Sequence, residues 1–204
     1  MPPSNEIQHI VSAWKFLLMM AIAGAVAITL VSFLFPLRYS STVRMLVTQT
    51  VASDVDPYTA MKSAERVAGN LAMLLQTSTF MDKTLTTAAG FDDKYFPSDD
   101  TDKRKLWSKT VVPTVTAGSG LITVVVYHPK VQQAEILADA AARTLVDQTS
   151  NYFGENVHAQ LMDTPLNSKW IVRPRFLQNA IFGLVAGFLI GFAFVLIKIA
   201  KQRS

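Results

Sequence analysis

Two long runs of apolar residues, one near each end, dominate the hydrophobic pattern of this chain. The first covers residues 16–35 and the second residues 176–197, and neither contains a charged side chain. About 20 helical residues cross the ~30 Å hydrocarbon core of a bilayer. Lipid offers the backbone no hydrogen-bond partner, so a spanning segment must be helical. The pattern therefore predicts two membrane-spanning helices.

The first run differs from a cleaved signal peptide, whose apolar stretch has roughly 7–15 residues. It is longer than that, a 15-residue lead precedes it, and its small residues lie inside the run rather than after it. We therefore expect an uncleaved anchor. A buried core helix is the alternative for both runs, but such helices rarely run so long without a charge.

The two spans divide the chain into five parts. We expect a tail (1–15), a transmembrane helix (16–36), one domain with a proline-containing return segment (37–175), a second transmembrane helix (176–197) and a second tail (198–204).

The expected domain begins with an alternating pattern. One face of the run holds Tyr39, Ser41, Val43, Met45 and Val47. A period of two predicts a half-buried strand, almost continuous with the first span.

Helical spacing follows. Asp56-Pro57 is typical of a helix start, and apolar residues then recur three and four positions apart, at Met61, Ala64, Ala68, Leu71 and Leu75. We expect a short helix from Ser78 to about Gly90, an acidic surface loop over 91–102 and a short basic helix over 102–110.

In the second half of the expected domain, the sequence pattern predicts a hairpin, a long helix and a last strand. The hairpin arms are 111–117 and 121–127, joined by Gly118-Ser119-Gly120, and Pro113 confines the first arm to a sheet edge or a strand start. The helix covers about 130–152 and ends at Gly154. The last strand has Val157, Ala159 and Leu161 on one face, and a segment marked by Pro165 and Pro174 leads to the second span. The expected fold class is α+β, with a small, mainly antiparallel sheet in one extracytoplasmic domain flanked by the two spans.

The net charge of +4 is unevenly placed along the chain. Residues 37–175 hold 15 of the 19 Lys and Arg and 14 of the 15 Asp and Glu, so the domain is close to neutral. The tails hold Lys15, Lys198, Lys201 and Arg203 against Glu6. Short basic tails beside a membrane favour anionic lipid and a cytoplasmic location for both termini, and give no case for nucleic acid.

No residue pattern indicates catalysis. The three histidines (His9, His128 and His158) lie far apart in the sequence, and the aspartates of 92–102 lack the ligand spacing of a calcium loop. The chain has no cysteine, which excludes a thiolate nucleophile and a zinc-thiolate site. We expect no catalytic, cofactor or metal site and hence no enzyme.

The second span carries a different pattern. Gly183, Gly187 and Gly191 recur every four residues, so all three lie on one helix face. Such a face lets another helix backbone approach closely. It predicts helix packing or oligomerisation, with the first span or a neighbouring subunit as the partner. Beyond it, the basic tail residues Lys198, Lys201 and Arg203 are candidates for contact with a cytoplasmic partner.

The order of these features resembles the polysaccharide co-polymerases, the Wzz-type chain-length determinants, in the compact capsule-biosynthesis form without a fused tyrosine kinase. Four features carry the resemblance: the strand YSSTVRMLV after the first span, the strand and helix LITVVVYHPKVQQAEILADA, the proline-containing stretch over 163–175, and a glycine-patterned second span. In the strand–helix motif Pro129, Ala134 and Ala138 match the family in character, and Asp139 stands near its usual Asn.

The resemblance implies a non-enzymatic regulator of exopolysaccharide or capsule polymerisation and export. It implies a homo-oligomeric ring in the bacterial cytoplasmic membrane that holds a polymerase or the nascent glycan and sets its chain length. In some relatives a separate cytoplasmic tyrosine kinase docks on the tails; the tail here is short and has no aromatic residue. The alternative is a two-span sensor or adaptor whose outer domain binds a ligand and signals to a soluble partner.

Overall fold

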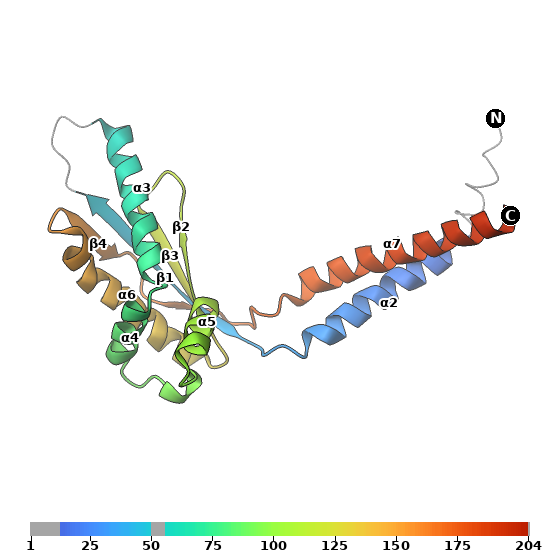
Figure 1. The fold of residues 1–204 in the computed structure, drawn as a ribbon, viewed down its shortest axis with the longest axis horizontal. Helices are drawn as coiled ribbons and strands as arrows, with labels where there is room; N and C mark the ends of the chain where they lie inside the picture. The colour runs from blue at the N-terminus through green and yellow to red at the C-terminus, as the bar shows by residue number, and fades with distance from the viewer. Residues whose placement is uncertain (1–12, 50–55, 204) are drawn as a thin grey trace. The chain divides into compact units, whose positions relative to one another are not determined.

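The computed structural model describes residues 13–49 and 56–203, which form two compact units (Figure 1). One unit, which we call the helix pair, contains α2 (Trp14–Ser32) and α7 (Phe176–Arg203). The other, the middle domain, covers Arg38–Val172. The middle domain combines helices with a small antiparallel sheet, which confirms the predicted α+β class.

The sheet has five strands within the described residues: β1 (Tyr39–Gln49), β2 (Val111–Val115), β3 (Leu121–His128), β4 (Val157–Leu161) and β5 (Leu166–Asn167). Its order is β2-β3-β1-β4, and β5 pairs with β1 at a separate position. The pairings between these strands are antiparallel. β2 lies at an edge, as Pro113 predicts.

Strand alternation decides which sheet face is buried. Val43 pairs with Val124 and Met45 with Ile122, and all four side chains are fully buried. The opposite face of β1 is partly or fully exposed at Thr42, Arg44, Leu46 and Thr48, and it is buried at Ser40. The alternating pattern of the sequence therefore correctly identifies the core face of β1.

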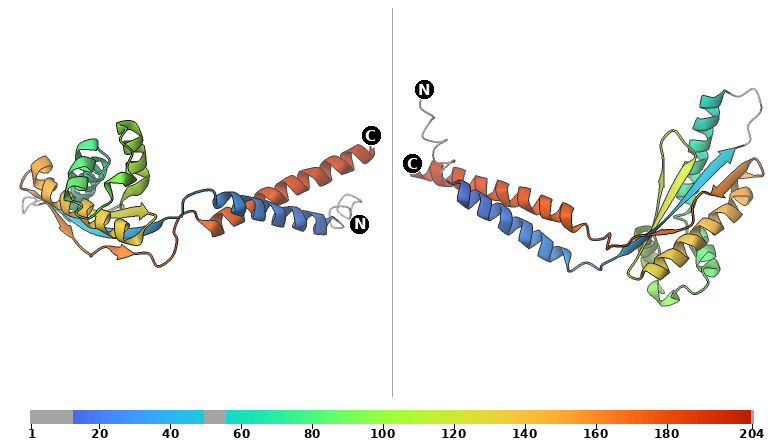
Figure 2. Two further views of the ribbon diagram at one scale, coloured as in Figure 1. Left: turned by 90° about the horizontal axis from the view of Figure 1, so that it is seen from below. Right: turned by 180° about the vertical axis from the view of Figure 1, so that it is seen from behind.

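The helices of the middle domain cover the buried face of the sheet (Figure 2). They are α3 (Pro57–Leu74), α4 (Ser78–Thr87), α5 (Asp100–Thr110) and α6 (Val131–Phe153), with a 3₁₀ turn at Asp93–Tyr95. Side chains from all four α-helices and from the sheet form one apolar core. Sheet and helices thus form two layers.

α3 begins where the sequence predicts. The Asp56 carboxylate accepts hydrogen bonds from the backbone N–H groups of Tyr58 and Thr59 at 3.0 and 3.1 Å, as an N-cap residue should. The apolar stripe is buried only in its second half: Leu71 is fully buried, whereas Met61 is 47% exposed. The first turns of α3 therefore extend beyond the core.

The acidic segment expected to be a surface loop is more ordered than its composition indicates. Phe91 and Phe96 are both 7% exposed and pack their rings 5.9 Å apart. α5 starts at Asp100, two residues earlier than predicted, because the Asp99 side chain accepts from the backbone N–H of Asp102. The two aromatic rings enter the core, while Asp92, Asp99 and Asp100 stay exposed at the surface.

Two glycine turns behave as predicted. Gly154 ends α6 with a φ of 79°, and its N–H donates to the carbonyl of Ser150. At the β2–β3 turn, a Cβ on Gly120 would overlap the carbonyl oxygen of Val47, so the hairpin needs glycine there to approach β1.

The return segment 162–172 pairs with β1 and is not a free linker. Backbone N–H groups of Ser168 and Val172 donate to the carbonyls of Ser40 and Arg38 at 2.7 and 2.9 Å. The proline-marked sequence gave no indication of β5. The first and last backbone segments of the middle domain therefore leave it side by side.

Candidate functional site: a glycine-lined helix contact

The two apolar helices, α2 and α7, pack side by side and antiparallel (Figure 1). Near one end, the side chain of Asn179 meets that of Ser32. Toward the other end, Gly191 lies against Met20 and Leu17. Rising residue numbers on α7 therefore match falling numbers on α2.

The glycine face of α7 forms this contact. Gly183, Gly187 and Gly191 are all buried, although the surrounding helix surface is exposed. A Cβ on Gly183 would lie 2.5 Å from the carbonyl oxygen of Gly24 and 2.8 Å from Cα of Ala25. Real Cβ atoms do not approach so closely, so the observed spacing of the backbones requires glycine.

The centre of the contact is the tightest. A Cβ on Gly187 would overlap the carbonyl oxygen of Met20 and lie 3.1 Å from Cα of both Ala21 and Gly24. These obstacles are backbone atoms, so a side-chain rotation cannot remove them. The face contacts α2 of the same chain, and an oligomerisation role for it stays a prediction.

α2 supplies a matching surface that the sequence prediction did not single out. Ala21, Gly24 and Ala25 place small side chains or none opposite the α7 glycines. Their spacing of three and four residues, continued by Leu17 and Ser32, was the available indication. Leu17, Ala21 and Ser32 are the buried residues of α2.

One polar link joins the helices among the described side chains. The Asn179 amide donates to the Ser32 hydroxyl at 2.7 Å, and that hydroxyl donates to the Ile28 carbonyl at 2.9 Å. The Phe33 and Phe176 rings pack beside it, 5.0 Å apart. An interhelical hydrogen bond of this kind makes a modest contribution to the association of helices in an apolar medium.

The outer faces of both helices remain exposed. Each helix is long and apolar enough to cross a membrane, yet only 17% of its most apolar window is buried. A core helix of a soluble protein would be mostly buried, and soluble proteins rarely expose such large apolar surfaces. The helix pair is therefore compatible with contact between these faces and lipid.

The basic residues predicted to contact a partner lie on the last turns of α7. Lys198 and Lys201 are exposed, and the helix continues to Arg203, whose side chain lies outside the described part. The structure brings Lys198 and Lys201 onto neighbouring turns but shows no partner for them to contact, so that role stays a prediction.

In the described part of the chain, no three His, Cys, Asp or Glu side chains are grouped so that they could hold a metal ion. His158 is exposed on β4, and His9 lies outside the described residues. A cavity of about 480 Å³ near α4 and α5 is lined by Asp82 and Lys103, which form an ion pair at 2.8 Å.

His128 is the buried histidine. Its Nδ1 accepts from the backbone N–H of Lys130 at 3.0 Å, and its ring lies 4.2 Å from that of Tyr95. Burial lowers the pKa of His128 because the charged ring would lose its water. A lowered pKa favours the neutral form of this ring.

No protein-family model matches the chain, and no curated protein matches it.

Proposed function

We propose that this protein is a non-enzymatic membrane regulator of exopolysaccharide or capsule polymerisation and export. In this proposal both termini lie in the cytoplasm of a bacterium, the middle domain lies outside the cytoplasmic membrane, and several copies form a ring. The ring holds a polymerase or the growing glycan and thereby sets glycan length. A cytoplasmic tyrosine kinase is a further proposed partner.

The order of elements is the observation that carries the proposal. An apolar helix leads into β1, one α+β domain follows, and an extended segment paired with β1 returns to a second apolar helix. The resemblance of the strand, helix and span sequences to chain-length determinants supports the same assignment. Such a layout suits a scaffold, because each end of the domain leads to an apolar helix that could hold it at a membrane.

The first experiment tests topology. Reporter fusions at Ser204 and near Asp99 should be active on opposite sides of the membrane, with the Ser204 fusion cytoplasmic. An external fusion at Ser204 would show that the orientation is wrong.

The second experiment tests the function itself. A strain that lacks the protein should make glycan with the same sugar repeat but an altered length distribution, and the intact chain should restore it. Gel profiles of the purified glycan measure length, and sugar analysis measures composition. An unchanged length distribution with an altered composition would indicate an enzyme instead.

A further inference from the structure

We propose that the return segment of the middle domain binds the lipid headgroup region of the membrane, with Trp170 as its anchor. The inference rests on the proposed insertion of α2 and α7 in a bilayer. It assigns the surface of residues 166–172 to one occupant, the headgroup layer of that same bilayer.

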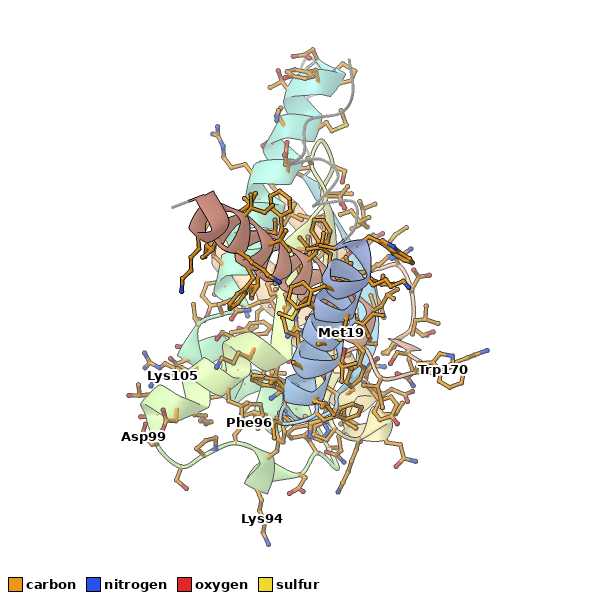
Figure 3. The ribbon with its side chains drawn as sticks, turned by 90° about the vertical axis from the view of Figure 1, so that its right-hand side faces the viewer. Met19, Lys94, Phe96, Asp99, Lys105 and Trp170 are labelled. Carbon is orange, nitrogen blue, oxygen red and sulfur yellow. The ribbon has the colours of Figure 1, made fainter. Side chains whose placement is uncertain are left out.

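Among the described residues, little protein packs against the side chain of Trp170. Its side chain is 82% exposed and projects outward from the return segment (Figure 3). Leu166 and Ile171 on the same segment are 70% and 37% exposed. The Trp side chain has a large apolar ring and one polar N–H group. It is enriched at membrane–water interfaces, where the ring contacts hydrocarbon and the N–H contacts water or headgroups.

The distance along the chain favours lipid as the occupant. Trp170 precedes Phe176, the first residue of α7, by six positions. Six residues reach at most roughly 20 Å when fully extended, so the indole stays close to the point where the span enters the membrane.

Charge favours the same surface. Lys169 adjoins Trp170, and Arg173 and Arg175 follow it before the span begins. Cationic side chains beside an aromatic ring suit anionic headgroups, because the charges attract phosphate while the ring enters the interface. A protein partner would have to compete with a lipid surface that the span holds within reach.

The segment is held firmly enough to transmit this anchoring to the middle domain. Backbone hydrogen bonds at Ser168 and Val172, two residues on either side of Trp170, tie it to the chain at Ser40 and Arg38. The Asn167 amide also donates to the Glu135 carboxylate on α6 at 2.7 Å. An anchored Trp170 would therefore hold the sheet near the membrane surface.

Three tryptophans allow a test with internal controls. Trp14 lies at the start of α2, Trp107 is 1% exposed in the core of the middle domain, and Trp170 is the proposed anchor. Replacing two of them with Phe at a time gives three full-length proteins with one Trp each. Each is inserted in vesicles of phosphatidylcholine and phosphatidylglycerol, and its fluorescence is measured with acyl-brominated lipids and with aqueous acrylamide.

The Trp170 protein should show blue-shifted emission, loss of most intensity with lipids brominated near the headgroup, and little loss with acrylamide. The Trp107 protein should respond to neither quencher. Strong acrylamide quenching of Trp170 without lipid quenching would overturn the proposal, and so would protection from both quenchers, which would mean contact with protein. If Trp14 also escapes the lipid quenchers, the proposed membrane insertion fails, and the Trp170 proposal fails with it.

Discussion

The middle domain and the helix pair differ in the size of the residues at their internal contacts. The domain buries large groups: Trp107 and Phe80 are each 1% exposed, and the Trp107 ring donates to the Leu75 carbonyl at 2.8 Å. The helix pair meets where side chains are missing, at Gly183 and Gly187. Large side chains fill the core of the middle domain, whereas the helix pair is stabilised by the close approach of two backbones.

The difference is the one expected if the helix pair lies in lipid and the middle domain in water. In water, burial of apolar area drives folding, so large side chains in a core contribute most. Between two helices in lipid that term is nearly absent, and close packing together with a few hydrogen bonds decides association. Removing volume should therefore harm the domain, whereas adding volume should harm the helix pair.

The largest effect is expected from Trp107→Ala. It removes a fully buried ring and leaves the Leu75 carbonyl without its donor, so the free energy of unfolding of the domain should fall by about 3–5 kcal/mol. Denaturant unfolding of the full chain in detergent, followed by circular dichroism, measures the loss. Trp170→Ala is the matched control and should change stability little, because that ring is exposed.

A smaller loss is expected from Gly187→Leu. The new side chain would overlap backbone of Met20 and Ala21, and overpacking typically costs about 1–3 kcal/mol. Because the chain has no cysteine of its own, single cysteines can replace Phe33 and Phe176 and be joined by a short bis-maleimide reagent. The Leu variant should cross-link less.

Ala186→Leu is the matched control for this substitution, because Ala186 is exposed on the same helix one residue away. It should cross-link as efficiently as the unmodified protein. Equal cross-linking in Gly187→Leu would show that the glycine face does not hold the helices together. Gly187→Ala should be milder than Leu, since it adds one methyl group.

Most of the fold could be predicted because most of its signals are local. Asp56-Pro57 and Gly154 fix helix ends through backbone chemistry, and the alternation of β1 identifies its buried face. β5 could not be predicted, since its two residues pair only because the chain returns along β1. The burial of Phe91 and Phe96 likewise depends on contacts that an acidic local composition conceals.

The sequence predicted one of the two surfaces that form the candidate site. Three glycines at intervals of four residues mark one face of α7, but the sequence alone cannot say which helix meets that face. The choice depends on the register of the two helices, in which Gly24 and Ala25 lie opposite Gly183. That register is a tertiary property, set by packing along both helices.

Mild acid should lower the free energy of unfolding of the middle domain through His128. The His128 pKa lies below its ordinary value near 6.5 because burial disfavours the charged ring. Below pH ~6.5 the unfolded chain therefore binds a proton more readily than the folded domain does, and stability falls until the folded ring also titrates. His128→Asn keeps an acceptor for the Lys130 N–H and should remove this component of the pH dependence, measured by denaturant unfolding between neutral and mildly acidic pH. An unchanged slope in the variant would assign the effect to other groups.

The smallest effect concerns the polar exception within the helix pair. Hydrogen bonds between membrane helices average ~0.6 kcal/mol and reach at most ~1.7 kcal/mol, because the separated helices find other partners. A double-mutant cycle with Ser32→Ala and Asn179→Ala should give a coupling energy in that range, measured by unfolding in mixed detergent micelles. Thr29 provides the control, since its hydroxyl donates to Ala25 within its own helix at 2.8 Å. A cycle of Thr29→Ala with Asn179→Ala should show no coupling. Coupling of equal size at Thr29 and Ser32 would contradict a specific role for the Asn179–Ser32 hydrogen bond and would assign the loss of stability to a general loosening of the two helices.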